Sequence, residues 1–171
     1  MTRAALRLLD KEGMSALSMR AVAKAARTTT PTLYDRFENH ENLLAAITKR
    51  INEELLGRIA AQNSIESMIL ECVQYAASHP YRYELLYKQR AKIWATDEPK
   101  PVFEALKKQL AVQLKMRGAA LDETGLALMA LMHGSSVFRI AMGPNSAAHA
   151  EVEKATSFAV RRIVRESRRT K

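Results

Sequence analysis

Apolar side chains recur at spacings of three and four residues along almost the whole chain, and this helical spacing is the feature that most limits its fold. The clearest case lies between about residues 40 and 63, where a stripe runs without proline through Leu43, Leu44, Ile47, Ile51, Leu55 and Ile59. Such a stripe predicts one amphipathic helix of about twenty residues. No segment shows the period-two alternation of a half-buried strand. The sequence therefore predicts an all-α protein.

Shorter helices are predicted on both sides of this long helix. Gly13 ends the first of them, and Ser18 is suited to cap the second, because its hydroxyl can accept a hydrogen bond from a free backbone N–H. After the long helix, five more are predicted at residues 64–79, 80–94, 102–117, 122–142 and from 146 onward. This pattern predicts a three-helix front domain at residues 1–45. A second domain at residues 46–171 would hold the long connector helix and the five that follow.

The charge of the chain points to a polyanionic partner. Its 171 residues include 27 Lys and Arg against 18 Asp and Glu, a net charge of +9. That surplus fits either nucleic acid or an anionic membrane surface and does not choose between them. No apolar run approaches the roughly 20 residues that span a bilayer, and the start lacks the features of a signal peptide. A lone cysteine, Cys72, argues against a secreted fold built on disulfides. A cytoplasmic protein without membrane attachment is expected.

No arrangement of residues points to catalysis or to a bound cofactor. The four histidines fall on different predicted helices, without a pair at i, i+4 and without an acidic partner at ligand spacing, so no metal site is expected. The sequence also lacks a glycine-rich nucleotide loop and an obvious pair of nucleophile and base. We therefore expect a protein that is not an enzyme and that has no cofactor.

Residues 28–37, with the sequence TTTPTLYDRF, are predicted to begin a helix with a hydroxyl-rich first turn. Threonine and proline are poor inside a helix but suit its start. With the helix at residues 18–26, this segment fits a helix-turn-helix, whose second helix enters the DNA major groove N-terminus first. Short hydroxyl side chains there can bind phosphates or base edges. Spacing alone favours an ordinary capped helix with a solvated face, because two short helices and a turn are common.

Four spaced motifs keep one register over residues 1 to about 50: AxxLLxxxG from Ala5, LSMRxVA from Leu17, PTLYxxF from Pro31 and ExLL from Glu41. Together they resemble the DNA-binding domain of TetR/AcrR-type transcriptional regulators. The resemblance implies an all-helical dimer whose front domain binds double-stranded operator DNA, and whose larger domain binds a small-molecule effector that releases the DNA. It implies that DNA is contacted by Ser18, Arg20, Thr29, Thr30, Thr32, Tyr34, Arg36 and His40.

The sequence departs from the family pattern at three places. The turn of the helix-turn-helix carries Arg27 where a glycine is usual, and a left-handed conformation there would cost about 1 kcal/mol. His40 stands where a phosphate-binding lysine is common. Family members usually have residues before the position of Met1, so the first helix is expected to be truncated. These departures bear on DNA affinity and sequence preference more than on the fold.

The predicted second domain holds most of the aromatic residues and methionines. A mainly apolar effector is predicted among Tyr75, Tyr87, Trp94, Phe103, Met129 and Phe138. The same side chains, taken singly, also fit the ordinary packing of a core. Small residues at 134–136 would let a second helix approach the helix at 122–142 closely, which suits a homodimer formed with the last helix. The predicted dimer residues are His133, Gly134, Val137, Val152, Ala155, Ala159 and Ile163.

The interpretation that unites these features is a dimeric, ligand-responsive DNA-binding regulator, a repressor released from a palindromic operator by its effector. One alternative is a helical small-molecule-binding module that has lost operator binding, which Arg27 and His40 would fit. A third class, an all-α enzyme or a basic protein of membrane surfaces, has only the net charge in its favour. Salt-dependent binding to a palindromic duplex would separate the first from the other two.

Overall fold

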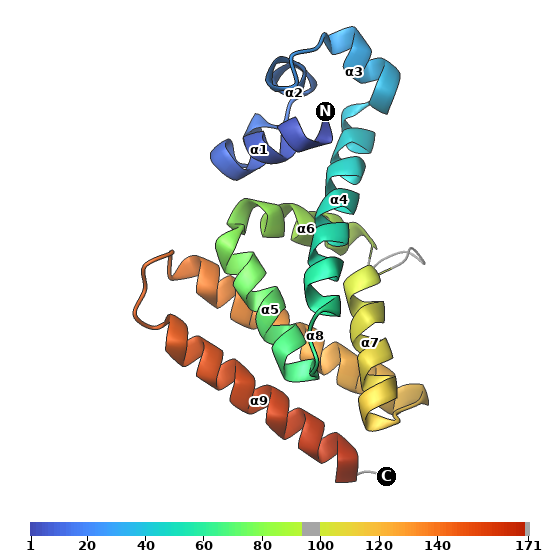
Figure 1. Cartoon of the computed structure of the whole chain (residues 1–171), viewed down its shortest axis with the longest axis vertical. Coiled ribbons are helices and arrows are strands. Elements are labelled where there is room, and N and C mark those ends of the chain that lie inside the picture. Colours follow the sequence, from blue (N-terminus) through green and yellow to red (C-terminus); the bar gives the residue numbers. More distant parts are fainter. Residues whose placement is uncertain (94–99, 170–171) are drawn as a thin grey trace. The chain divides into compact units, whose positions relative to one another are not determined.

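The computed structural model describes residues 1–93 and 100–169. These residues form nine α-helices and one short 3₁₀ helix, without a strand among them, so the predicted all-α class is confirmed (Figure 1). The helices are α1 Thr2–Glu12, η1 Met14–Ala16, α2 Met19–Ala25, α3 Thr30–Phe37, α4 His40–Ala60, α5 Ile65–Ser78, α6 Pro80–Ile93, α7 Pro101–Leu114, α8 Gly118–Ala141 and α9 His149–Arg169. Over this described part of the chain, every helix is too short or too polar to cross a membrane.

The chain divides into two compact units. The first comprises residues 1–54 together with α6, and the second comprises residues 55–78 and the described chain from residue 100 onward. Helix α4 runs through this division without interruption, so its early turns belong to the first unit and its last turns to the second. The predicted boundary after residue 45 stays a prediction, and the observed division differs from it in grouping α6 with the front helices.

An ion-pair network explains why α6 groups with the front of the chain. Arg82 on α6 donates two hydrogen bonds of 2.6 Å to the carboxylate of Asp10 on α1, and a third of 2.8 Å to Glu54 on α4. Only 12% of the Arg82 side chain is exposed. A bidentate guanidinium–carboxylate pair fixes geometry as well as charge. Close by, Gly13 lets the ring of Tyr81 approach, since a Cβ at Gly13 would lie 3.2 Å from it.

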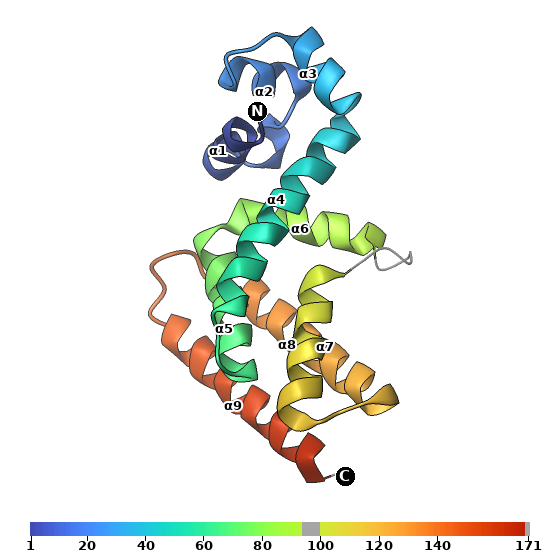
Figure 2. The same cartoon turned by 45° about the vertical axis from the view of Figure 1, so that its right-hand side comes forward.

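In the second unit, helices α5, α8 and α9 pack side by side (Figures 1 and 2). Their contact surfaces bury apolar side chains such as Tyr75, Leu128 and Val160. One polar contact is enclosed among them: the Thr156 hydroxyl on α9 donates to the Ser135 hydroxyl on α8 at 2.7 Å. Both hydroxyls are buried, and their mutual bond removes the cost of burying them unpaired.

Three predicted helix boundaries after α6 differ from the structure by three or four residues. The helix predicted to run to residue 117 ends at Leu114, because Lys115 adopts a left-handed conformation with φ of 53°. The chain can then turn, and α8 starts at Gly118, four residues before its predicted start. The last helix begins at His149 rather than at 146, because the Ser146 hydroxyl accepts from the Ala148 N–H in the preceding turn.

Candidate nucleic-acid interface

Helix α2 begins at a serine cap, as the sequence predicts. The Ser18 hydroxyl accepts a hydrogen bond of 3.2 Å from the Ala21 N–H, which satisfies one of the free donors of the first turn. Met19, Val22 and Ala23 are buried and hold the helix on the core of the first unit. The side chain of Arg20 faces solvent. The start of α2 is therefore fixed by local bonds and leaves a basic side chain outside.

The turn between α2 and α3 is closed by a Schellman motif. The Thr28 N–H bonds to the Ala23 carbonyl at 3.0 Å, and the Arg27 N–H bonds to the Lys24 carbonyl at 3.1 Å. This pattern requires a left-handed residue after the helix cap, normally glycine. Here Arg27 fills the position with φ of 53°. The turn thus has the usual geometry of a glycine turn, but it is made by an arginine whose side chain is exposed.

Hydroxyl groups organise the first turn of α3. Thr29 is the N-cap: its hydroxyl accepts from the Thr32 N–H at 3.3 Å, and the two hydroxyls lie 2.8 Å apart. Pro31 occupies the first turn, where a missing N–H has no cost. Thr29 and Thr32 are exposed, whereas Thr30 is partly covered. The turn therefore presents bound but accessible hydroxyls, in the place from which a recognition helix would read a groove.

The rest of α3 separates a buried face from an open one. Leu33 and Phe37, four residues apart, are buried and anchor the helix. Tyr34 and Arg36 are on the exposed side, and 48% of Tyr34 is exposed although most of its side chain is an apolar ring. The side chains of Tyr34 and Arg36 are thus exposed on the same short helix as the hydroxyl-rich first turn (α3 in Figure 1).

The start of α4 is tied to the helix-turn-helix by two side chains. Nε2 of His40 donates to the Leu17 carbonyl at 2.5 Å, in the segment just before α2. The Asn39 side chain accepts from the Asn42 N–H at 2.9 Å and caps α4. His40 was predicted as a DNA contact, and its exposed ring leaves that prediction open. What the sequence did not predict is its structural bond to the backbone ahead of α2.

Positive charge collects on the helix-turn-helix. Residues 18–36 carry four basic side chains against one acidic side chain, Asp35, which gives a net charge of +3. The four are Arg20, Lys24, Arg27 and Arg36, and all are exposed. Lys24 and Arg27 were not among the predicted DNA contacts. Their exposure beside the turn could have been inferred from the apolar spacing of α2, which leaves both outside the buried stripe.

Comparison with known proteins identifies this domain. The sequence model of the family described as bacterial regulatory proteins, tetR family, matches residues 2–47. The DNA-binding domain of this chain belongs to the TetR family. An uncharacterized HTH-type transcriptional regulator of Mycobacterium tuberculosis is 31% identical over 86 residues, which cover 46% of this chain and 39% of that protein. The chain therefore matches less than half the length of this curated relative.

The TetR fold extends beyond the matched segment. A crystal structure of a TetR variant from Acinetobacter baumannii in complex with minocycline superposes with a TM-score of 0.69 and 19% identity. The likeness covers 99% of this chain and 94% of that one. At this identity it establishes a shared all-α fold that includes the second part of the chain. The resemblance carried by the four motifs is confirmed by the family model over residues 2–47.

The six predicted effector residues do not gather at one place. The structure puts three of them in the core of the second unit: Tyr75, Phe103 and Met129. Tyr87 belongs to α6 in the first unit and is 51% exposed, and Phe138 on α8 is 63% exposed. Trp94 lies outside the described residues. The set stays a prediction, and the pocket described below is lined by other side chains.

The predicted dimer residues all lie on α8 and α9 and are at least partly accessible. Val137 and Ala155 are exposed, and the other five are half-buried. Among the seven, none is sealed inside the core of the protomer. Their surfaces are therefore available to a second copy of the chain.

Proposed function

We propose that this protein is a homodimeric transcriptional repressor that binds a palindromic operator and is released from it by a small-molecule effector. The observation that carries the proposal is the TetR-family helix-turn-helix with an accessible recognition surface. Hydroxyls of the first turn of α3, the phenol of Tyr34 and four exposed basic side chains share this domain. These are the groups that bind phosphates and base edges in a major groove.

The roles within this surface follow from their chemistry. Thr30 and Thr32 stand at the leading end of α3, where side chains reach base edges. The phenol of Tyr34, one turn later, suits a phosphate oxygen. Arg20 and Arg36 would add charge-assisted phosphate contacts, which hold the register without reading sequence. Ser18 and Thr29 already cap helices, so their hydroxyls would serve DNA only as additional partners of a phosphate.

Large apolar side chains exposed on α8 and α9 support the homodimer. Leu126, Val137 and Phe138 on α8 and Phe158 on α9 are between 47% and 63% exposed. Large apolar side chains grouped on a helix surface mark an interaction site more often than they are left in water. A second copy with the same face would cover them in a two-fold interface.

Gly134 on α8 also supports the homodimer. It lies in the middle of α8, where glycine costs about 1 kcal/mol relative to alanine. Inside the described protomer nothing lies within 4 Å of the position of its missing Cβ. Gly125, by contrast, accommodates the ring of Phe103 at 3.2 Å. A close helix from a partner would explain a glycine that the protomer itself does not need.

Selection of duplexes from a random pool tests DNA binding without knowing the operator. The expected result is an enriched two-fold symmetric sequence whose half-sites are centred about one DNA turn, roughly 34–36 Å, apart. Its affinity should fall steeply with salt, as phosphate contacts require. Failure to enrich any sequence at low salt would favour the alternative, a ligand-binding module that has lost operator binding.

The selected duplex then separates base reading from phosphate binding. Thr30→Ala and Thr32→Ala should each weaken binding by about 1–3 kcal/mol and relax preference at particular base pairs. Tyr34→Phe should weaken binding to all sequences alike. Competition against single-base variants of the duplex measures both effects. Unchanged base preferences in both threonine variants would remove the groove-reading assignment.

Light scattering at micromolar concentration tests the homodimer. Ala159→Asp should shift the protein toward monomers, because it would bury an unpaired charge at the seam. Val112→Asp is the matched control, since Val112 is 69% exposed and lies on α7, which is not one of the two proposed dimer helices. A monomeric wild type, or equal dissociation of both variants, would contradict the two-half-site arrangement.

A further inference from the structure

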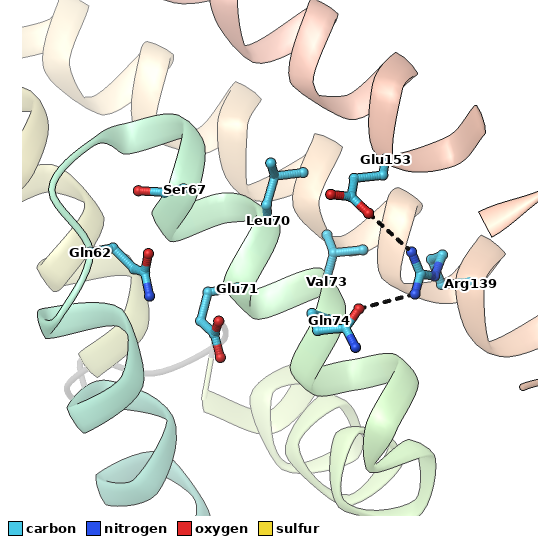
Figure 3. A pocket seen from close by; sticks show the side chains of 8 residues that line it. All are labelled: Gln62, Ser67, Leu70, Glu71, Val73, Gln74, Arg139 and Glu153. Carbon is cyan, nitrogen blue, oxygen red and sulfur yellow. Dashed lines mark hydrogen bonds and ion pairs between the residues drawn. The ribbon is translucent and has the colours of Figure 1, made fainter. Parts of the chain in front are cut away.

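A pocket of about 360 Å³ lies in the second unit, against the exposed side of α5. Figure 3 shows that α5 supplies its floor, while the end of α8 and the start of α9 close one side. Its wall combines apolar, amide, hydroxyl and charged groups. The lining residues are Gln62, Ser67, Leu70, Glu71, Val73, Gln74, Arg139 and Glu153. This volume is at the lower end of the range for small-molecule sites.

The unusual member of this wall is a buried cation. Only 8% of the Arg139 side chain is exposed. Its Nη2 donates to Gln74 Oε1 at 3.1 Å, and its Nη1 donates to the His149 carbonyl at 3.4 Å. Its Nε is buried and has no hydrogen-bond partner in the described chain. A buried guanidinium is normally matched by a close carboxylate, because an unpaired buried charge is costly.

The two carboxylates that line the pocket do not supply that match. Glu153 approaches Nη1 only to 3.8 Å, and 57% of its side chain is exposed (Figure 3). Glu71 is already held by Arg58 at 2.5 Å. Neutral oxygens from an amide and a backbone carbonyl therefore provide the short contacts to the guanidinium. The pocket contains a buried positive charge that is only weakly neutralised.

We propose that this pocket binds a small monocarboxylate with an apolar body. The carboxylate would displace Glu153 and bond to Arg139, including the vacant Nε, while the body would rest on Leu70 and Val73. A pocket that holds one buried guanidinium and two acidic side chains in its wall favours a single negative charge over a phosphate dianion. This inference rests on the proposed function, because it takes the bound monocarboxylate to be the effector of the repressor.

The pocket also has a physical connection to α4. Glu71 lines the pocket and holds Arg58, which lies in the last turn of α4 and also stacks over the Tyr75 ring at 5.4 Å. An anionic ligand beside Glu71 would change the charge balance of that pair. Helix α4 continues without a break to the helix-turn-helix, so this contact is where the bound ligand would first act on the connector.

Calorimetry with acid and amide pairs tests the site directly. The probes are hexanoate, phenylacetate and 1-naphthylacetate, each compared with the amide of the same shape. At least one acid should bind at least about tenfold more tightly than its amide, as expected for a charge-assisted bond to a buried guanidinium. Arg139→Met should abolish that difference. Glu153→Gln should strengthen binding of the acid by about threefold or more, since it removes the competing carboxylate.

Two matched controls make the result specific. Lys154→Gln removes an exposed positive charge next to Glu153, and Glu151→Gln removes an exposed negative charge two residues before it on α9. Both should leave the acid affinity unchanged within about twofold. Thermal unfolding checks each variant, and if Arg139→Met does not fold, Glu153→Gln against Glu151→Gln decides alone. Equal binding of every acid and amide, or equal effects of these two glutamate variants, would overturn the proposal.

DNA binding is measured separately, so the two proposals fail in different ways. In one outcome, a carboxylate binds with the expected pattern and yet leaves the affinity for the selected duplex unchanged. That result would support the carboxylate site and refute its role as the effector site. A protein that releases DNA in response to an uncharged compound, with Arg139→Met unaffected, would keep the repressor and refute the carboxylate site.

Discussion

Replacing Arg27 by glycine should stabilise the protein, although it removes a charged side chain from the proposed DNA surface. Arg27 holds φ of 53° in the Schellman turn between α2 and α3. The left-handed conformation costs a residue with a Cβ about 1–2 kcal/mol. Glycine avoids that cost but loses about 0.4–1 kcal/mol through the greater freedom of its unfolded chain. The expected net gain is therefore about 0.5–1 kcal/mol.

Arg27→Ala isolates the part of this effect that belongs to the backbone. Alanine removes the guanidinium but keeps the Cβ, so it should not relieve the strained φ. The glycine variant should be more stable than the alanine variant by about 0.5–1 kcal/mol, measured by urea denaturation with circular dichroism. Lys115→Gly is the parallel case, since Lys115 also has φ of 53°, and Arg20→Gly within α2 should be destabilising by about 1 kcal/mol.

The difference in stability between Arg27→Gly and Arg27→Ala tests whether the turn is strained. If Arg27→Gly is no more stable than Arg27→Ala, the turn is not strained in the way its geometry indicates. Binding to the selected duplex gives an independent result from the same two variants. Equal loss of affinity in both would show that the arginine side chain contacts phosphate, whereas unchanged affinity in both would leave Arg27 with only its role in the turn.

Four further substitutions address packing, hydrogen bonds and ion pairs. Arg82→Gln should destabilise the first unit by about 2–3 kcal/mol, because it breaks a largely buried bidentate ion pair with α1; urea denaturation measures it. His40→Ala should cost about 1 kcal/mol in the same assay through loss of its backbone hydrogen bond, and should weaken DNA binding by displacing α2. Gly125→Ala should destabilise by about 1 kcal/mol through overlap with Phe103, whereas Gly57→Ala, which meets nothing within 4 Å, should stabilise by a similar amount.

The helix-turn-helix could be predicted closely because its determinants are local in sequence. Ser18 and Thr29 cap helices three residues ahead of the N–H groups they bind, and Leu33 and Phe37 anchor α3 at the spacing of one turn. Even the left-handed Arg27 was predictable, because a family glycine marks the position. These features depend on a few neighbouring residues and on helical geometry, so one sequence contains most of the information.

Features that depend on distant partners were not predictable in the same way. Arg82 and Asp10 are 72 residues apart, and nothing near either residue indicates their ion pair or the grouping of α6 with α1. Arg139 in the last turn of α8 has the position of an ordinary solvated helix-end cation. Its burial follows from the packing of α5 and α9 on that end, which the spacing of apolar residues along one helix does not specify.

Helix α4 runs from the helix-turn-helix to the proposed carboxylate pocket, and different contacts hold its two ends. At its start, Asn39 caps the helix and His40 binds the segment ahead of α2. At its other end, Arg58 is held by Glu71 of the proposed carboxylate pocket. Gly57 stands immediately before Arg58, and an interior glycine lowers local helix stability by about 1 kcal/mol. A change of charge at the pocket would therefore act next to the residue of α4 with the lowest helix propensity. The early turns, held by the caps and by the ion pair of Glu54 with Arg82, would move as one body with the helix-turn-helix.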